Sequence, residues 1–277
     1  MFGFILAAAS SFVSEISTSI GKTEVLKRAE SRYAMAFLTY FVAFFWFLGI
    51  IFYQQDFKFS WESLPTFGTR VLLEIILTYV SIKAIVESSR STFSFVRVGT
   101  MPLLLLVDIY SGYTISIIQI LGIGVIISAI LFLFKNHGIE KKGIGYVIAS
   151  TLLAVVTISL YKYDISHYNS VATEQFLTIG ILLMYFYVAA YYSSRKNPLK
   201  LLLRPIFFIQ SFGDGFAGVL GSFAYSFAPA SLVVAVLRSS AILFSMLSGN
   251  VYFHEKKLLL KIFVASLLVF GIILLSR

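Results

Sequence analysis

The stretch VVAVLRSSAILF, residues 233–244, is an apolar run with an arginine, Arg238, near its centre. An arginine costs at least about 2.5–3.5 kcal/mol at the centre of a membrane-spanning helix, so its presence there needs a physical reason. One explanation is structural: a buried acid pairs with Arg238 and holds it in place. The other is functional: the guanidinium faces a cavity and binds an anion. Both explanations require that the side chain face protein or water and not lipid.

The composition around this stretch is that of a membrane protein. Of the 277 residues, 58% are hydrophobic and 13% are charged, and the mean hydropathy is +0.89. Soluble proteins carry roughly twice that fraction of charge, so we expect a bilayer to be the solvent. The sequence has no cysteine, which excludes disulfide bonds and thiolate metal sites. The first residues lack a basic segment ahead of the apolar ones, so we expect a first span and not a cleaved signal peptide.

Ten stretches are long and apolar enough to be predicted as membrane spans, for which a helix needs roughly 20 mostly apolar residues. Several connections between them are only a few residues long, so consecutive helices are expected to be antiparallel neighbours. We therefore predict an all-α membrane protein with ten transmembrane helices. The predicted spans are 2–20, 33–53, 68–86, 91–110, 115–134, 143–161, 170–192, 205–227, 230–251 and 258–275.

The two halves of the chain resemble each other. A shift of 141 residues aligns SFVRVG with AVLRSS and places Arg97 on Arg238. Chance similarity between apolar segments is the competing explanation, but a matched pair of mid-span arginines is harder to obtain by chance. Because each half holds five spans, the second half must enter the membrane from the opposite face. We predict two inverted five-helix repeats, 1–137 and 142–277, an arrangement typical of secondary transporters with a binding site between the repeats.

Five charged residues are predicted to lie well inside the spans, namely Glu15, Glu74, Arg97, Asp214 and Arg238. At a rise of about 1.5 Å per residue, the two arginines fall within roughly 7 Å of each other along the membrane normal. Under the same shift Glu74 falls one residue from Asp214, so each half contributes one arginine and one acid.

Two arrangements of these charges remain open. In the structural one, Arg97 pairs with Asp214 or Glu15, Arg238 pairs with Glu74, and the pairs tie the helices together. In the functional one, at least one arginine faces a central cavity and binds a carboxylate, phosphate or other anion through its fixed fork of donors. The two are compatible if an acid holds an arginine until the substrate displaces it.

Other residues near these charges have two interpretations each. Glu15 could carry a proton, since partial burial favours the neutral carboxyl, or it could hydrogen-bond to the hydroxyl side chains beside it. Asp214 lies between glycines in FGDGFAGVLG, which indicates either a loosened helix at a transport site or close helix packing through small residues. The aromatic candidates for a cavity wall are Tyr40, Trp46, Tyr79 and Tyr225.

No motif for catalysis or cofactor binding occurs in the sequence. The three histidines lie in connections or at span ends without metal-ligand spacing, and no P-loop, dinucleotide fingerprint or Gly-x-Ser-x-Gly motif is present. We therefore expect no enzymatic activity, cofactor or metal. Two other classes stay open: a membrane scaffold in which every charge is paired, and an intramembrane enzyme in which acids converge on one site.

The basic residues are distributed unequally between the two faces of the predicted bundle. Most of them, including Lys22, Arg90 and Lys261, are assigned to connections or span ends on the face away from the termini. Arg70 is among the few assigned to the face of the termini. The positive-inside rule then predicts a cytoplasmic face away from the termini.

The segment APASLVVAVLRSSAILFSMLSGNVYFHEKKLLLKIFVASLLVFGIILL, residues 228–275, resembles the C-terminal half of an EamA-type repeat of the drug/metabolite transporter superfamily. The resemblance is carried by Pro229-Ala230-Ser231 at the start of a span, by the turn at His254-Glu255 and by Gly271. Pro102 and the stretch IIQILGIG stand in matching places of the first half, so it covers essentially the whole chain. The sequence departs from the family pattern at two places. Tyr113 or Thr114 stands where the first repeat is expected to have an acid, and His254 stands in place of the usual glycine.

The resemblance implies a ten-helix transporter whose central cavity is lined by the fourth span of each repeat, which would put Arg97 and Arg238 on the cavity wall. Members carry amino acids, metabolites, sugars or nucleotide-sugars. Their termini are usually pictured as cytoplasmic, in conflict with the distribution of basic residues here, so the orientation stays open.

The leading hypothesis is therefore an alternating-access secondary transporter in a cell (inner) membrane for a small polar, anionic metabolite. Arg97 and Arg238 would bind the metabolite, with Glu15, Glu74 and Asp214 as gates or proton carriers. The alternative is a proton-coupled exporter of amino acids, amines or drugs in which the acids bind substrate. The expected partners are a small-molecule substrate and the bilayer, with no nucleic acid, and the expected state is a monomer or weak homodimer.

Overall fold

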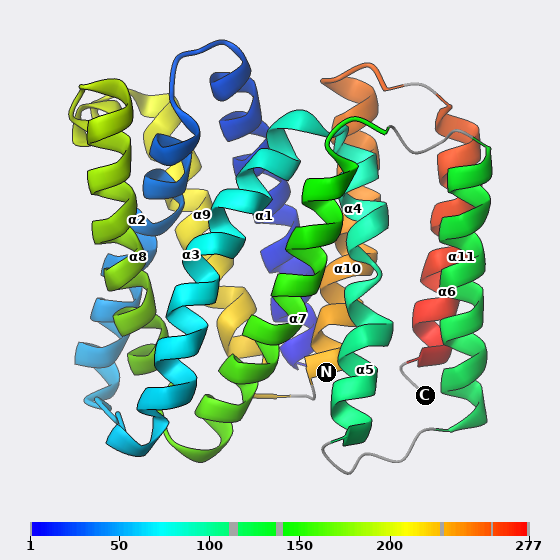
Figure 1. The fold of residues 1–277 in the computed structure, drawn as a ribbon, viewed down its shortest axis with the longest axis horizontal. Coiled ribbons are helices and arrows are strands. Elements are labelled where there is room, and N and C mark those ends of the chain that lie inside the picture. The colour runs from blue at the N-terminus through cyan, green and yellow to red at the C-terminus, as the bar shows by residue number, and fades with distance from the viewer. Residues whose placement is uncertain (1, 111–115, 137–140, 228–229, 256, 276–277) are drawn as a thin grey trace.

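Helices dominate the computed structural model of the chain, which describes residues 2–110, 116–136, 141–227, 230–255 and 257–275 (Figure 1). These residues form eleven α-helices and two short 3-10 helices, and no strand occurs among them. The α-helices are α1 (Phe2–Leu26), α2 (Arg32–Gln54), α3 (Leu64–Glu87), α4 (Arg90–Arg97), α5 (Thr100–Tyr110), α6 (Ile117–Lys135), α7 (Ile144–His167), α8 (Val171–Ser194), α9 (Pro205–Ala224), α10 (Ala230–Val251) and α11 (Leu258–Leu275). The 3-10 helices are η1 (Trp61–Ser63) and η2 (Pro198–Leu203).

Seven helical segments are long and apolar enough to cross a membrane, so the chain has the makeup of a multi-pass membrane protein. They are α1, α2, α7, α8, α9, most of α10, and the segment Arg90–Tyr110 that α4 and α5 form together. The apolar parts of α6 and α11 are shorter, and α3 is not among the seven. α3 carries two charged residues, Arg70 and Glu74, within its predicted span.

Local signals in the sequence explain where several helices begin. The side chains of Ser31, Ser89 and Ser170 accept hydrogen bonds from backbone N–H groups three residues further on, and so cap α2, α4 and α8. Pro65 and Pro205 lie in the first turns of α3 and α9, where a missing N–H group costs nothing.

The predicted fourth span is not one continuous helix. α4 ends at Arg97 and α5 begins at Thr100, whose hydroxyl donates to the Arg97 carbonyl at 2.6 Å. Pro102 provides the physical reason: in an unbroken helix it would remove the hydrogen bond to the Val98 carbonyl and clash with it. Met101 instead donates its N–H to the Val98 carbonyl at 3.0 Å, which closes a tighter turn.

The helices pack in pairs that are far apart in the sequence. α1 packs against α9, α3 against α7, and α2 against both α8 and α9. α10 contacts α1, α4, α5 and α11, and α11 pairs with α6 at one edge of the molecule (Figure 1). The α1–α2, α3–α4, α8–α9 and α10–α11 connections lie at the upper end of the bundle as drawn in Figure 1. The first residues of α1 and the last residues of α11 lie at the lower end.

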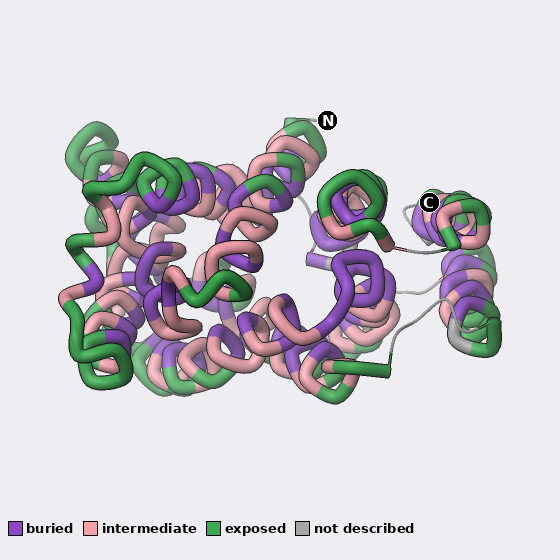
Figure 2. The backbone as a smooth tube through the Cα atoms, turned by 90° about the horizontal axis from the view of Figure 1, so that it is seen from above, coloured by how far each residue is buried: buried purple, intermediate pink, exposed green. Residues whose placement is uncertain are grey.

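Buried residues face the inside of the bundle and exposed residues form its outer rim, as seen from above (Figure 2). Many of the exposed side chains are large and apolar, including Leu72 at 66%, Met184 at 73% and Leu247 at 61% exposure. So many exposed apolar side chains are expected where lipid and not water surrounds the protein.

Three glycines of α9, namely Gly213, Gly215 and Gly221, allow it to approach its neighbours closely. A Cβ atom at Gly215 would lie 2.7 Å from the backbone nitrogen of Ala43 on α2, and one at Gly221 would lie 2.9 Å from Oγ of Ser10 on α1. A Cβ at Gly218 would meet no atom within 4 Å, and this residue borders a cavity. The structure thus places Gly215 and Gly221 at helix contacts, as close packing requires, but not Gly218.

Candidate functional site

Two neighbouring cavities, each bordered by both polar and apolar side chains, lie among α1, α2, α3, α4, α8 and α9. One has a volume of about 230 Å³ and the other about 160 Å³. Thr39, Tyr40, Glu74 and Asp214 border both, and we call the two together the central cavity. A water molecule occupies about 30 Å³ in the liquid, so this space has room for a small polar metabolite.

Arg97 borders the larger of the two cavities without a partner of opposite charge. Among the described residues it forms no ion pair, and its Nε has no hydrogen-bond partner. Its guanidinium carbon lies 5.1 Å from the centre of the Phe93 ring. Its electrostatic neighbours are Arg238, Tyr225 and Glu74. The structural arrangement in which Arg97 pairs with Asp214 or Glu15 is therefore not the one that the structure has.

Arg238 lies beside the break between α4 and α5. Its Nε donates a hydrogen bond to the Thr100 hydroxyl at 3.3 Å, and it borders neither part of the central cavity. It forms no ion pair within the described part of the chain, so the arrangement in which Arg238 pairs with Glu74 is not the one that the structure has either. Because Arg97 and Arg238 are electrostatic neighbours, Arg238 adds positive charge behind the cavity wall.

Two acids border the same cavity. Asp214 accepts a hydrogen bond from the Thr39 hydroxyl at 2.9 Å and has no cation within ion-pair distance among the described residues. Glu74 lies 4.0 Å from Nε of Arg70, one turn away on α3. The cavity wall thus presents both signs of charge.

Glu15 belongs to a different cluster, at the upper end of the bundle. Its carboxylate accepts hydrogen bonds from Nε and Nη2 of Arg90 at 3.0 and 2.6 Å, and also from the Ser248 hydroxyl. This contact joins α1, α4 and α10, and it leaves Glu15 outside the central cavity. Sequence reasoning placed Arg90 outside the predicted span 91–110, in a connection or span end, but its side chain is only 2% exposed.

A second acid strengthens this upper cluster. Glu255, in the α10–α11 connection, accepts hydrogen bonds from the backbone N–H of Arg90 at 2.6 Å, from the Ser91 hydroxyl and from Lys261 at 2.9 Å. Burial alone would raise the pKa of Glu255, but the hydrogen bonds from Ser91 and Lys261 hold it below its ordinary value. Glu255 stays ionised and binds the N-terminus of α4, where the helix dipole favours an anion.

An unpredicted ion pair lies on the lower side of the central cavity. Nη1 of Arg70 lies 2.7 Å from Oε1 of Glu174, and the two side chains are 4% and 0% exposed. Nη2 of Arg70 donates to Gln175, and Asn169 donates to the second oxygen of Glu174. The pair joins α3 to α8. Sequence reasoning placed Arg70 near a membrane face and did not consider Glu174, which lies in the first turn of its helix.

The four aromatic candidates lie in different surroundings. Tyr40 borders both parts of the cavity and shares a hydrogen bond of 2.5 Å with Thr78. Tyr225 is buried and is an electrostatic neighbour of both Arg97 and Arg238. Tyr79 and Trp46 do not border the central cavity. Tyr79 stacks on Tyr33, and Trp46 is 36% exposed and packs on Phe212 and Phe216.

Comparison with known proteins gives no family for this chain. No protein-family model matches it, and no curated protein matches it. The resemblance to the drug/metabolite transporter superfamily therefore stays a prediction. Pro229, which helps to carry the resemblance, and Tyr113 and Thr114, where the sequence departs from the family pattern, lie outside the described residues. Over the residues that the structure describes, no cluster of three or more histidine, aspartate or glutamate side chains could hold a metal ion.

Proposed function

We propose that the chain is a secondary membrane transporter for a small polar metabolite, and that Arg97 binds an anionic group of that metabolite in the central cavity. The observation that carries the proposal is the cation itself: Arg97 borders the cavity without an ion-pair partner among the described residues. A half-buried guanidinium without an ion pair lacks the strong partner that would offset its lost hydration, so an arriving carboxylate or phosphate gains a charge-assisted hydrogen bond from it. Arg238, an electrostatic neighbour of Arg97 that does not border the cavity, adds to the positive potential at Arg97.

The helix contacts support the further proposal of ten spans in two inverted repeats, 1–137 and 142–277. In such a scheme α4 and α5 count as one span, and α1 of the first repeat corresponds to α7 of the second. The contact of α1 with α9 then has its counterpart in the contact of α7 with α3. The pairs α2–α8 and α6–α11 join corresponding helices, as does the contact of α10 with α4 and α5. A two-fold relation of this kind is typical of secondary transporters, including the EamA-type proteins that the sequence resembles.

Two buried ion pairs beside the cavity suit alternating access. The Glu15–Arg90 pair joins α1 to α4 next to the larger cavity, which Ser14 and Thr18 border, and the Arg70–Glu174 pair joins α3 to α8 at the smaller one, which Arg70 borders. In the proposed cycle one cluster separates while the other stays closed, so the cavity is open to one side of the membrane at a time. Glu74 and Asp214 are then the groups that contact the remainder of the substrate or carry protons, whereas Glu15 serves as a gate.

The second candidate function is proton-coupled export of an amine or amino acid. Asp214 favours it, because this carboxyl borders the cavity and has no cation within ion-pair distance in the described structure. An amino group could occupy the space in front of Asp214 while Arg97 remained a neighbouring charge.

Uptake into proteoliposomes tests the proposal. Labelled anionic, zwitterionic and cationic metabolites are presented to the purified protein, to Arg97→Gln and to Asp214→Asn. A hydrogen bond to a charged group contributes about 1.5–3 kcal/mol, so we expect Arg97→Gln to lower uptake of the anion roughly tenfold to hundredfold. Asp214→Asn is expected to retain anion uptake.

The matched control is Arg32→Gln, which removes an arginine that lies outside the cavity and pairs with Glu87 at the upper end. It is expected to transport like the parent. Uptake of every anion at the parental rate by Arg97→Gln contradicts the proposed site. Loss of amine uptake in Asp214→Asn alone favours the second candidate.

A further inference from the structure

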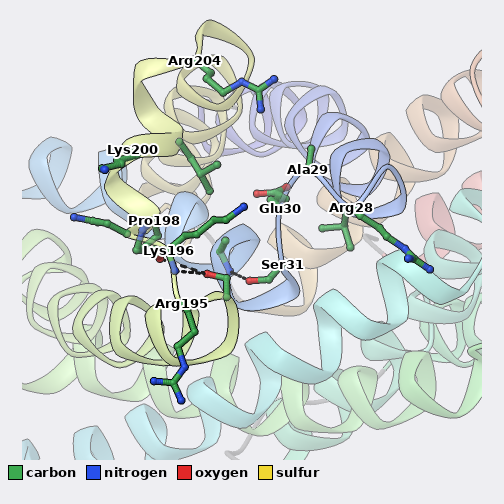
Figure 3. A pocket seen from close by; sticks show the side chains of 14 residues that line it. Arg28, Ala29, Glu30, Ser31, Arg195, Lys196, Pro198, Lys200 and Arg204 are labelled. Atoms are coloured by element: carbon green, nitrogen blue, oxygen red, sulfur yellow. Dashed lines mark hydrogen bonds between the residues drawn. The ribbon is translucent and has the colours of Figure 1, made fainter.

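A second and larger pocket lies at the upper end of the bundle, away from the central cavity. Its volume is about 690 Å³, and it is bordered by the α1–α2 connection and by the segment that runs from the end of α8 through η2 to Arg204 (Figure 3). Five basic residues line it: Arg28, Arg195, Lys196, Lys200 and Arg204. We call it the basic pocket.

The cations of the basic pocket are not compensated by acids. All five side chains belong to exposed residues, and none forms an ion pair within the described parts of the chain. In Figure 3 the ammonium group of Lys196 points toward the Glu30 carboxyl, whereas Arg28 and Arg195 extend outward. The guanidinium carbon of Arg204 lies 5.3 Å from the centre of the Phe207 ring. This contact keeps the Arg204 side chain next to α9. The pocket thus has a strong excess of positive charge.

Glu30 is the one acidic residue on the pocket wall and is only 7% exposed. Its oxygens form no hydrogen bond of normal geometry in the described structure, and neither does the nearby amide of Gln210. Burial raises the pKa of Glu30 to about 9, and the charges of Asp214 and Glu24 act in the same direction. The carboxyl is therefore neutral at physiological pH. A neutral carboxyl can donate a hydrogen bond, so it does not repel an anion.

We propose that the basic pocket binds a phosphate-bearing anion at the membrane surface. Lys196 and Arg204 supply the cations that pair with phosphate oxygens. Basic pockets between transmembrane helices are sites for the headgroups of anionic lipids. Leu199, Leu203 and Ile206 next to the pocket are exposed by 40%, 83% and 38%, so acyl chains of a lipid could lie against them. A soluble phosphate compound offers the same chemistry to the pocket without using these apolar side chains.

A metal cation is a poor occupant of this pocket. One neutral carboxyl surrounded by five cationic side chains offers a divalent ion no net attraction. The proposal does not depend on transport through the central cavity, since no residue borders both spaces.

Binding measurements on the full-length, delipidated protein in detergent test the proposal. The probes are inorganic phosphate, short-chain dioctanoyl phosphatidylglycerol and, as the zwitterionic reference, dioctanoyl phosphatidylcholine. The pocket variant is Lys196→Gln combined with Arg204→Gln, and both positions are exposed, so folding is expected to be retained. We expect the anionic lipid to bind the parent, to exceed the zwitterionic lipid about tenfold in affinity, and to weaken at least about tenfold in the pocket variant.

The matched control combines Lys141→Gln with Lys142→Gln, which removes the same charge from exposed positions of the α6–α7 connection outside the pocket. It is expected to bind like the parent. Competition by inorganic phosphate at similar affinity identifies a soluble phosphate as the source, and preference for the phospholipid identifies the headgroup. Equal binding of both lipids, or parental affinity in the pocket variant, overturns the proposal. Transport assays on the same variants show whether the proposed substrate site at Arg97 still works, so the two proposals can be judged separately.

Discussion

Buried and half-buried arginines have two different surroundings in this chain, which differ in whether a carboxylate lies within ion-pair distance. Arg70 and Arg90 each lie within 2.7 Å of a buried carboxylate and tie helices together. Arg97 has no such partner among the described residues and borders a cavity. The sequence could locate Arg97 from its position in the middle of an apolar run. It could not assign the pairs, because an ion pair between α3 and α8 or between α1 and α4 depends on which helices meet, and spacing along the chain does not contain that information.

Glu30 gives a prediction at the same scale. Between about pH 4.5 and 9 the folded protein holds a proton on Glu30 that the unfolded chain has released. Stability should therefore fall as the pH rises through this range, by at most about 1.4 kcal/mol per pH unit. Glutamine does not ionise, so folding of Glu30→Gln requires no proton uptake at this position. We therefore expect this variant to unfold at a higher temperature than the parent at pH 8, with a smaller difference at pH 5. The ionisable groups around Glu30 are Glu24, Arg28, Lys196, Lys200, Arg204 and Asp214.

Thermal unfolding in detergent at the two pH values measures this effect. Glu62→Gln, at an exposed position of the lower end, serves as the control and should show no such dependence. An identical pH dependence in Glu30→Gln and in the parent would mean that Glu30 is ionised in the folded state.

At the scale of single helices, proline and glycine positions explain what the apolar pattern does not. The pattern predicted one continuous span over 91–110, whereas Pro102 divides it into α4 and α5. α7 also continues to His167, beyond the predicted end at 161, and the buried Asp164 carboxylate in this extension accepts a hydrogen bond from the Thr66 hydroxyl of α3. A polar side chain that hydrogen-bonds to another helix can lie inside a helix, beyond the end of its apolar run, and hydropathy alone cannot indicate this.

The glycines of α9 allow a direct comparison of two substitutions. Gly215→Ala would place its Cβ against the backbone of α2, so α9 must shift, and overpacking of this kind typically costs about 1–3 kcal/mol. Gly218→Ala meets no atom within 4 Å, and alanine is favoured over glycine inside a helix by up to about 1 kcal/mol. We expect thermal unfolding to move to a lower temperature in the first variant and to be unchanged or higher in the second. Equal stability of both variants would contradict the close approach of α9 to α2.

At the scale of the whole molecule, the composition predicted the all-helical class, and a helix is present at each of the ten predicted ranges within the described residues. Seven helical segments are long and apolar enough to cross a membrane, so the number of ten spans stays a prediction. The pairing of α1 with α9 and of α3 with α7 could not be derived from hydropathy, which reports burial in lipid and not the identity of a neighbour.

The two buried ion pairs give a prediction about access to the central cavity. The chain has no native cysteine, so a cysteine at Ser222, which borders the cavity, can be labelled alone. Arg90→Gln loosens the upper cluster and Glu174→Gln the lower one. We expect labelling by an impermeant maleimide to accelerate at least about tenfold, from opposite sides of the membrane in the two variants, since about 1.4 kcal/mol shifts such an equilibrium tenfold.

Glu87→Gln is the control for this experiment, because it breaks the half-exposed pair with Arg32 at the upper end and leaves the buried pairs intact. It should label at the parental rate. Unchanged labelling in both Arg90→Gln and Glu174→Gln, in protein that remains folded, would show that these pairs do not control access.

The order in which helices find their partners has a consequence for biosynthesis. As the chain leaves the ribosome, α3 meets α7 first, α2 then meets α8, and α1 meets α9 later still. α6 waits for α11, the last helix of all. The early helices must therefore stay in the lipid, or with the insertion machinery, until translation is nearly finished. A chain cut short before α11 leaves α6 unmatched, and that exposed surface is a signal by which cellular quality control can recognise an unfinished molecule.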